Sequence, residues 1–214
     1  MSFETIDDAQ AFVAAVLDST IQPNRLEILN RAALEAHGTP AGAGVAVSVA
    51  SVEAAVIAQE EHVRTLARSV NGRARPAPVE WWDRYGSVAA QASIALRIGT
   101  LTSAVAETVR VTERLFGGPT PIVGTAATGT LLVLMPAPQS SRALDQLRDC
   151  VAGLRATVGP HGGHVVITRA PRAIREAIDP WGPVDAGALA LMRGLKDEFD
   201  PHRVLNPGRF VGGL

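Results

Sequence analysis

The sequence lacks the features that mark secreted, membrane-spanning or nucleic-acid-binding proteins. Its single cysteine, Cys150, cannot form an intramolecular disulfide. No window approaches the roughly 18 continuous apolar residues of a membrane span, and the N-terminus lacks the basic-then-apolar order of a signal peptide. The 20 Lys and Arg against 21 Asp and Glu leave a net charge of −1, which creates no field to hold a polyanion. We therefore expect a soluble, cytoplasmic protein with no nucleic-acid partner and no membrane span.

The chain is nevertheless rich enough in apolar residues to form a core. It has 214 residues, of which 47% are hydrophobic and 19% are charged. Cys150 lies at helical spacing with Leu147, Val151 and Leu154, so we expect it to be a buried small side chain and not a nucleophile.

Hydrophobic periodicity predicts the order strand, helix, strand, strand, helix, strand in the first part of the chain. The predicted elements are 2–5, 7–19, 25–30 (strand or helix), 44–50, 51–70 and a strand that ends near residue 78. We expect Asp7 or Asp8 to cap the first helix and Ser51 to cap the second, whose apolar face includes Val52. This order is that of a ferredoxin-like lobe.

The same order appears again after a short helix around Trp81. Its predicted elements are 93–99, 102–116, 121–126, 130–135, 140–158 and 164–169, and a last helix spans 185–198. We therefore predict an α+β fold of duplicated ferredoxin-like (βαββαβ) lobes, with antiparallel sheets covered by helices. The predicted division is a first lobe at 1–78, a connecting helix segment at 79–92, a second lobe at 93–170, and C-terminal helices with a tail at 171–214.

The tail contains two turn-forming units, Asp200-Pro201 and Asn206-Pro207-Gly208. The segment LKDEFDPHRVLNPGRF resembles the closing signature of FAD-linked oxidases, in which a final helix runs into DP, a short spacer and NPG. The order of the lobes, the WWDR segment at 81–84 and this tail are similar to the C-terminal substrate (cap) domain of that family. With DPWGP at 179–183, the resemblance is strongest to the E-type subunit of glycolate oxidase.

This resemblance implies a function that the chain does not perform alone. In the family, FAD is held mainly by an N-terminal domain with a glycine-rich loop, and no segment here has the pattern of that loop. The expected partners are the FAD-binding domain of the same parent protein, a small 2-hydroxy acid and an iron–sulfur subunit that accepts electrons. We expect the chain alone to be inactive and to copurify without FAD. The alternative is a non-enzymatic ferredoxin-like module that only binds a partner.

Related 2-hydroxyacid dehydrogenases carry a metal and proton-transfer motif, GHxGDGNxH, which aligns with residues 124–132 here. Thr125 and Leu132 replace its histidines, and Thr128 replaces its acid. Hydroxyls and a leucine cannot hold a divalent cation, so we expect no catalytic metal. His161 and His164 are spaced as two ligands could be, but no neighbouring Cys, Asp or Glu completes a set.

Four residues are candidates for binding. Arg84 and Arg97 match positions that the resemblance places near the substrate carboxylate, which an arginine fork can hold through both oxygens. Arg84 could equally be a surface helix residue, and Arg97 could pair with a carboxylate across the sheet. The resemblance places Asn206 and Arg209 beside the flavin.

The adjacent tryptophans and two arginines near the C-terminus are more simply explained by packing and solvent exposure than by binding. Of the adjacent Trp81 and Trp82, one is expected in the core, while the other could cover a flavin or an apposed domain. Arg172 and Arg175 are expected on a solvated helix face.

Overall fold

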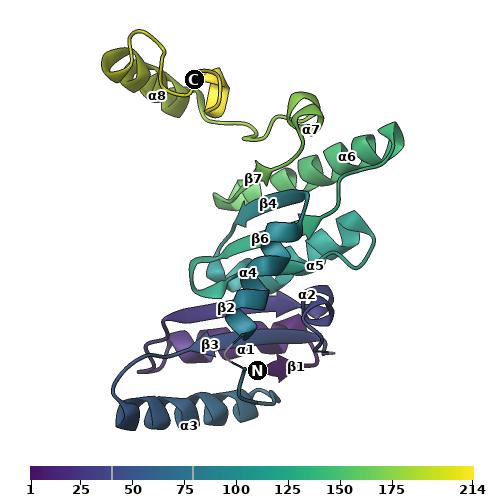
Figure 1. Cartoon of the computed structure of the whole chain (residues 1–214). Coiled ribbons are helices and arrows are strands. Elements are labelled where there is room, and N and C mark those ends of the chain that lie inside the picture. The colour runs from purple at the N-terminus through teal and green to yellow at the C-terminus, as the bar shows by residue number, and fades with distance from the viewer. Residues whose placement is uncertain (40, 79) are drawn as a thin grey trace.

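The computed structural model describes residues 1–39, 41–78 and 80–214, and its strands form one antiparallel sheet (Figure 1). The seven strands of the sheet follow the order β1-β3-β2-β5-β6-β4-β7. They span β1 Ser2–Phe3, β2 Arg25–Asn30, β3 Ala43–Ser48, β4 Ile94–Gly99, β5 Ile122–Thr125, β6 Thr130–Met135 and β7 His164–Arg169. The α-helices span α1 Ile6–Leu17, α2 Arg31–Ala36, α3 Glu53–Ser69, α4 Trp81–Gln91, α5 Val105–Phe116, α6 Ser141–Val158, α7 Arg172–Ala177 and α8 Ala186–Phe199. The predicted α+β class, with helices covering an antiparallel sheet, is confirmed.

The second half of the sheet has the full ferredoxin-like strand order, whereas the first half lacks a complete last strand. In the second half, β4 lies between β6 and β7, and both crossovers use helices. In the first half, the strand predicted to end near residue 78 is reduced to a single bridge between Ser2 and Arg73. Pro76 and Pro78 have no backbone N–H to donate, so the ladder stops there. Val79, where the predicted connecting segment begins, lies outside the described residues, and the division into domains stays a prediction.

The two halves share one sheet because β2 pairs with β5. The register places Glu27 opposite Thr125, Ile28 opposite Gly124 and Leu29 opposite Val123. β2 and β5 are the second strands of their halves. Each is the outer strand of its half, and their pairing joins the two halves at these edges. The sequence pattern predicts each half but does not predict this continuous sheet.

A buried asparagine fixes this junction. Asn30 is only 2% exposed. Its Oδ1 accepts hydrogen bonds from the amides of Ala33, at 3.0 Å, and Ile122, at 2.9 Å. Its Nδ2 donates to Glu113 Oε1, at 2.8 Å, and to the Thr120 carbonyl, at 2.9 Å. One side chain therefore caps α2 and ties the end of β2 to the start of β5 and to α5.

The sheet has a different cover on each face. One face packs on α1, α3, α5 and α6 and contributes Ile94, Leu96 and Ile98 of β4 to the larger core. The other face packs on α2 and α4 and contributes Ala95 of β4 to a smaller core. Because side chains alternate along a strand, Arg97 points to the face that carries α4.

Two helix starts differ from the predicted ones. The helix α1 begins at Ile6, and Thr5 is its N-cap, because the Thr5 hydroxyl accepts the Asp8 amide hydrogen at 3.1 Å. The helix α3 begins at Glu53 with Val52 as N-cap and no side-chain hydrogen bond, so Ser51 lies one residue too early to cap it. Val52 is 74% exposed, so the predicted apolar face is wrong at this end of α3.

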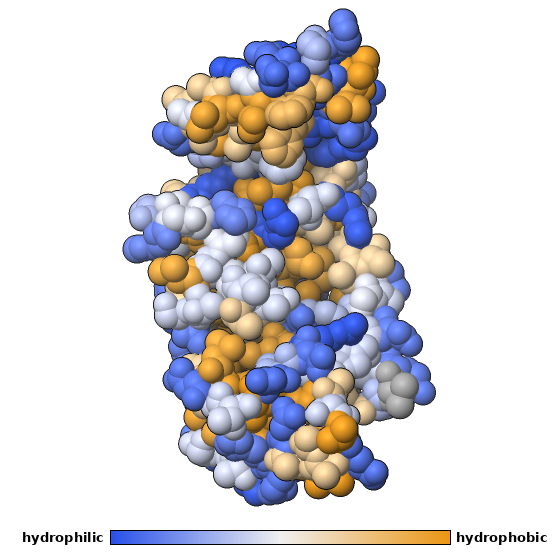
Figure 2. Space-filling model, turned by 90° about the vertical axis from the view of Figure 1, so that its left-hand side faces the viewer, coloured by the Kyte–Doolittle hydropathy of each residue, from blue (hydrophilic) through white to orange (hydrophobic). Residues whose placement is uncertain are grey.

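The last helix and the tail project from the body beyond β7 and α7 (Figure 1). None of the residues of α8 is buried. Apolar side chains gather on this upper part of the molecule (Figure 2), and Leu191 and Phe199 are 74% and 78% exposed. No helix in the described ranges combines the length and apolar character needed to cross a membrane.

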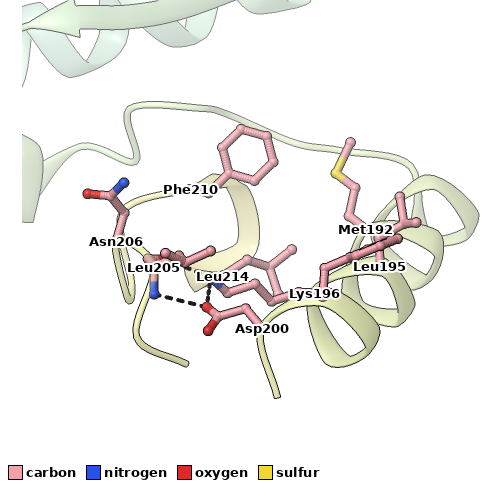
Figure 3. A pocket seen from close by; sticks show the side chains of 9 residues that line it. Met192, Leu195, Lys196, Asp200, Leu205, Asn206, Phe210 and Leu214 are labelled. Atoms are coloured by element: carbon pink, nitrogen blue, oxygen red, sulfur yellow. Dashed lines mark hydrogen bonds and ion pairs between the residues drawn. The ribbon is translucent and has the colours of Figure 1, made fainter. Parts of the chain in front are cut away.

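The tail is folded back on α8 by one buried carboxylate (Figure 3). Asp200 is 4% exposed; it pairs with Lys196 Nζ at 2.5 Å and accepts the amides of Val204, at 2.9 Å, and Leu205, at 3.0 Å. The hydrogen bond from Lys196 and those from the two amides hold the pKa of Asp200 below its ordinary value. Lys196, the single lysine of the chain, also donates to the Leu205 carbonyl at 2.7 Å.

Replacing Asn30 with alanine should strongly destabilise the junction of the two halves. The substitution leaves the buried amides of Ala33 and Ile122 without acceptors, and we expect a loss of about 3 kcal/mol in the free energy of unfolding. Urea denaturation measures this loss. Asn24→Ala, which removes an exposed asparagine, is the matched control and should cost about 0.5 kcal/mol or less. Equal losses in the two variants would contradict the role of Asn30.

The fold of the tail should depend on pH through Asp200. Its pKa is lower in the folded protein than the ordinary 3.8, so its stabilisation is complete above pH 3.8 and is lost as the pH falls through the folded pKa. We expect the NMR amide resonances of Val204 and Leu205 to move toward unfolded positions only below that pH. Asp200→Asn should show altered shifts already at pH 7 and little further change on acidification. Unchanged shifts at pH 7 in the variant would refute this account.

Candidate functional site

One candidate site is a cavity of 780 Å³ between the β4–β7 edge of the sheet and the C-terminal tail. This volume is within the usual range for small-molecule sites. Its polar wall comes from Arg97, Thr168, Arg175, Asp179 and Arg209. Five separate segments supply these side chains: β4, β7, α7, the turn that follows α7, and the tail. The predicted substrate residue Arg97 and the predicted cofactor residue Arg209 thus line one cavity.

Arg97 reaches this cavity from the middle of β4. Its cross-strand neighbours are Leu132 of β6 and Val166 of β7. No carboxylate faces it across the sheet, so the alternative that Arg97 pairs with one is wrong within the described chain. Its guanidinium is exposed and available to a ligand.

The turn at 179–183 lines the same cavity as Arg97, and the Ile167 amide of β7 donates to its Pro180 carbonyl at 2.8 Å. The Asp179 carboxylate accepts the amides of Trp181, at 3.0 Å, and Gly182, at 3.1 Å. Arg155 donates to the carbonyls of Val165, at 3.2 Å, and Asp179, at 2.8 Å, which joins the turn to β7. Burial lowers the pKa of Arg155.

Glycine is required at one position of this turn. Gly182 has φ +78°, and a Cβ there would lie 2.6 Å from Arg155 Nε. The close approach of Arg155 to the backbone therefore explains the glycine in DPWGP.

An aromatic contact brings the tail to the cavity. The rings of Trp181 and Phe210 meet edge to face, with centroids 5.1 Å apart. Phe210 follows Arg209 directly, so this contact sets the position at which Arg209 enters the cavity wall.

Arg84 lies elsewhere. It is exposed on α4 and lines neither this cavity nor the pocket beside the tail. It neighbours His37, which stacks on Trp81 and Tyr85 with ring centroids 5.5 and 6.0 Å away. Burial, and then the positive charge of Arg84, lower the pKa of His37. The structure therefore does not bring Arg84 and Arg97 into one cavity, although α4 covers the face of the sheet to which Arg97 points.

The aromatic residues of α4 serve to pack that helix on the sheet. Trp81 and Trp82 are both half-buried and meet edge to face at 4.8 Å. Tyr85 donates its hydroxyl to Glu27 Oε2 at 2.8 Å, and burial raises the pKa of Tyr85. Thr125, at the first histidine position of the aligned metal motif, donates to Glu27 Oε1 at 3.1 Å.

Asn206 lines a different pocket, of 470 Å³, between α8 and the tail (Figure 3). Most of this pocket is apolar, from Met192, Leu195, Phe199, Leu205, Phe210 and Leu214. Asn206 has φ +47°, the left-handed conformation that the Asn-Pro-Gly turn uses here. Phe210 is shared between the two pockets, so the tail links them.

Metal-ligating side chains do not gather in the described part of the chain: no group of three His, Cys, Asp or Glu residues could hold an ion there. His161 and His164 are both exposed. Cys150 is buried, as its spacing predicts, and donates its thiol hydrogen to the Leu115 carbonyl at 3.0 Å.

Sequence reasoning missed Arg175 as a site residue. Its placement on an exposed face of α7 is correct, but that face borders the cavity. Its position in the sequence could have identified it. Arg175 lies four residues before the DPWGP turn, and residues of that turn line the same cavity.

The comparisons with known proteins bear on this C-terminal region. No curated protein matches the chain. Residues 180–210 match the family of FAD linked oxidases, C-terminal domain. The matched segment runs from the turn at the cavity wall through α8 to Phe210, and so includes Trp181, Asn206 and Arg209. The match covers this C-terminal segment alone, and there the chain is similar to the C-terminal domain of FAD linked oxidases.

Proposed function

We propose that the chain is the cap domain of an FAD-dependent oxidoreductase that oxidises a 2-hydroxy acid, as the resemblance to the glycolate oxidase E-type subunit suggests. One observation carries the proposal. The segment that matches the FAD-linked oxidases supplies part of the lining of a cavity that is also lined by the exposed Arg97. The fold, the family match and an arginine suited to a carboxylate thus coincide at one place.

The residues of this chain suit contact with one edge of a flavin and do not enclose the whole cofactor. Arg209 has no side-chain partner in the described chain and lies beside the partly exposed rings of Trp181 and Phe210. A guanidinium beside aromatic rings suits the polar rim and flat face of a flavin. Asn206 borders the neighbouring apolar pocket. We propose that these two side chains, Asn206 and Arg209, contact the flavin, while another domain holds most of the cofactor.

The chain's own contribution is to bind and orient the substrate. FAD supplies the two-electron acceptor when it is bound. Arg97 would hold the substrate carboxylate through two parallel hydrogen bonds and so direct the hydroxyl-bearing carbon away from the sheet. Arg84, on the helix that covers the same face, is the second candidate for contact with the substrate. We also propose that the reduced flavin of the enzyme passes its electrons to an iron–sulfur subunit.

The alternative, a non-enzymatic module that binds a partner, is favoured by the exposed apolar residues of α8. Leu191, Leu195 and Phe199 are 74%, 59% and 78% exposed. The FAD-binding domain would cover the same residues in the enzyme. The gene context separates the two: a glycine-rich FAD-binding domain in the same or the adjacent reading frame supports the enzyme.

The proposal predicts flavin reduction by a 2-hydroxy acid. The chain, joined to the FAD-binding domain that its gene or a neighbouring gene encodes, should show bleaching of the flavin absorbance under anaerobic conditions. Arg97→Gln should raise the substrate concentration at half-maximal bleaching rate about tenfold, because one charge-assisted contact is lost.

The matched control is Arg148→Gln, on the opposite face of the molecule, where Arg148 pairs with Asp145. This variant should behave like the unmodified chain. The proposed function would be contradicted if no 2-hydroxy acid bleached the flavin. It would also be contradicted if Arg97→Gln bleached at the same substrate concentration as the unmodified chain.

A further inference from the structure

A buried histidine joins α2 to α4. His37 is the C-cap of α2 and is only 7% exposed. Its ring stacks on Trp81 and Tyr85 of α4, with ring centroids 5.5 and 6.0 Å away and interplanar angles of 29° and 19°. Trp81 and Tyr85 also stack on each other, at 5.4 Å. The contact between α2 and the first turns of α4 is therefore a cluster of three rings with similar orientations.

One nitrogen of His37 lacks a hydrogen-bond partner. Nε2 is buried, and no donor or acceptor of the described residues reaches it. A neutral imidazole tolerates this position, because its proton can sit on Nδ1 and leave Nε2 as a bare acceptor. The imidazolium carries an N–H on both nitrogens, so protonation would put a charge and an unpaired donor inside the ring cluster. The contact between α2 and α4 thus suits the neutral side chain and opposes the charged one.

The charged groups around this contact do not offset that cost. They are Arg31 and Glu35 of α2, Glu27 and Arg25 of β2, Arg84 of α4, and Arg75 in the segment that follows α3. Burial, and then the positive charge of Arg84, lower the pKa of His37. Glu27 accepts the hydroxyl hydrogen of Tyr85, and both charged residues of α2 are exposed to solvent. Arg25 lies over the ring of Trp82, and Arg75 donates to Thr39 Oγ1.

The other end of α4 is held independently of His37. Arg169 of β7 donates from Nη1 to three carbonyls at the end of α4, those of Ala89, at 2.7 Å, Ala90, at 3.0 Å, and Ala92, at 3.2 Å. The helix therefore crosses the sheet from β2 to β7, with a separate attachment at each end (Figure 1). Loss of the ring contact would free the first turns of α4 and leave its last turn in place.

We propose that His37 is a pH-sensitive latch for α4: when its imidazole takes up a proton, the first turns of α4 leave the sheet, while Arg169 keeps the last turn attached. The opening uncovers apolar residues of the smaller core, including Leu29 and Val123. The Tyr85 hydroxyl then exchanges Glu27 for water. This inference goes beyond the proposed function and does not depend on it.

The direction of the pH dependence follows from proton binding to the two forms of the latch. The pKa of His37 in the closed form is below its ordinary 6.5, whereas the open form exposes the imidazole to water. The closed form is therefore at full strength above pH 6.5 and loses stability as the pH falls below that value. Each pH unit favours the open form by up to about tenfold, until the pKa of the closed form is reached.

Tryptophan fluorescence of the 214-residue chain tests the latch. Trp81 and Trp82 lie in the first turn of α4, so Trp181→Phe leaves a chain whose emission reports on α4 alone. In this background, the acrylamide quenching constant should rise at least about twofold as the pH falls from about 8 to about 4.5. The midpoint should lie below pH 6.5. Far-ultraviolet circular dichroism should keep most of its helical signal, because only the first turns of α4 open.

Three variants in the same background separate the latch from other effects of pH. His37→Phe keeps a stacked ring that takes up no proton, so its quenching constant should stay low over the whole range. The matched control is His62→Gln, which removes an exposed histidine of α3 and should leave the response unchanged. Arg84→Gln removes the positive charge beside His37, so the midpoint should move to higher pH. This shift tests the latch even if His37→Phe does not fold.

Several outcomes would overturn the latch. One is a quenching constant that does not change with pH, or that rises equally in His37→Phe. Another is a fall in quenching on acidification, because it would mean that Trp81 and Tyr85 hold the imidazolium by cation–π attraction. A third is loss of the whole circular dichroism signal together with the rise in quenching, since the entire fold and not α4 would then open.

Discussion

The pairing of β2 with β5, held by Asn30, is the constraint on which the rest of the architecture depends. Each half of the chain would otherwise end in an open strand edge, which is prone to pair with other chains. The pairing covers both edges at once and makes one sheet of two halves. The amide of Asn30 satisfies four polar groups at this junction, so neither half can shift its register without burying unpaired groups.

The continuous sheet leaves β7 as the outer strand on the side where the chain emerges toward its tail. Arg155 fastens the turn after α7 to β7, and the contact between Trp181 and Phe210 brings the tail to the same place. Residues far apart in the sequence, such as Arg97 and Arg209, thereby line one cavity. The position of the cavity follows from two local interactions at the sheet edge, and the apolar face of α8 beside it stays open to a partner.

Much of this fold could be predicted from hydrophobic periodicity, because strands and helices with one buried face carry that face in their residue spacing. The elements of the second half and the end of α5 at Gly117 are examples. The junction could not be predicted in this way, since pairing of β2 with β5 depends on a tertiary hydrogen-bond network around one asparagine. The candidate site shows the same division. Resemblance singled out Arg97 and Arg209, but only the folded chain shows that Arg175 lines the same cavity and that Arg84 does not.

The central claim is that the sheet edge at β7 and the tail form the face that meets a flavin-bearing domain. Hydrogen–deuterium exchange of the chain, alone and joined to the FAD-binding domain that the proposed function requires, tests this most directly. The account predicts slower exchange in residues 164–182 and 199–214 and unchanged exchange in α1 and α3, which cover the opposite face of the sheet. Slower exchange confined to α1, α3 or α6, with β7 and the tail unaffected, would contradict it.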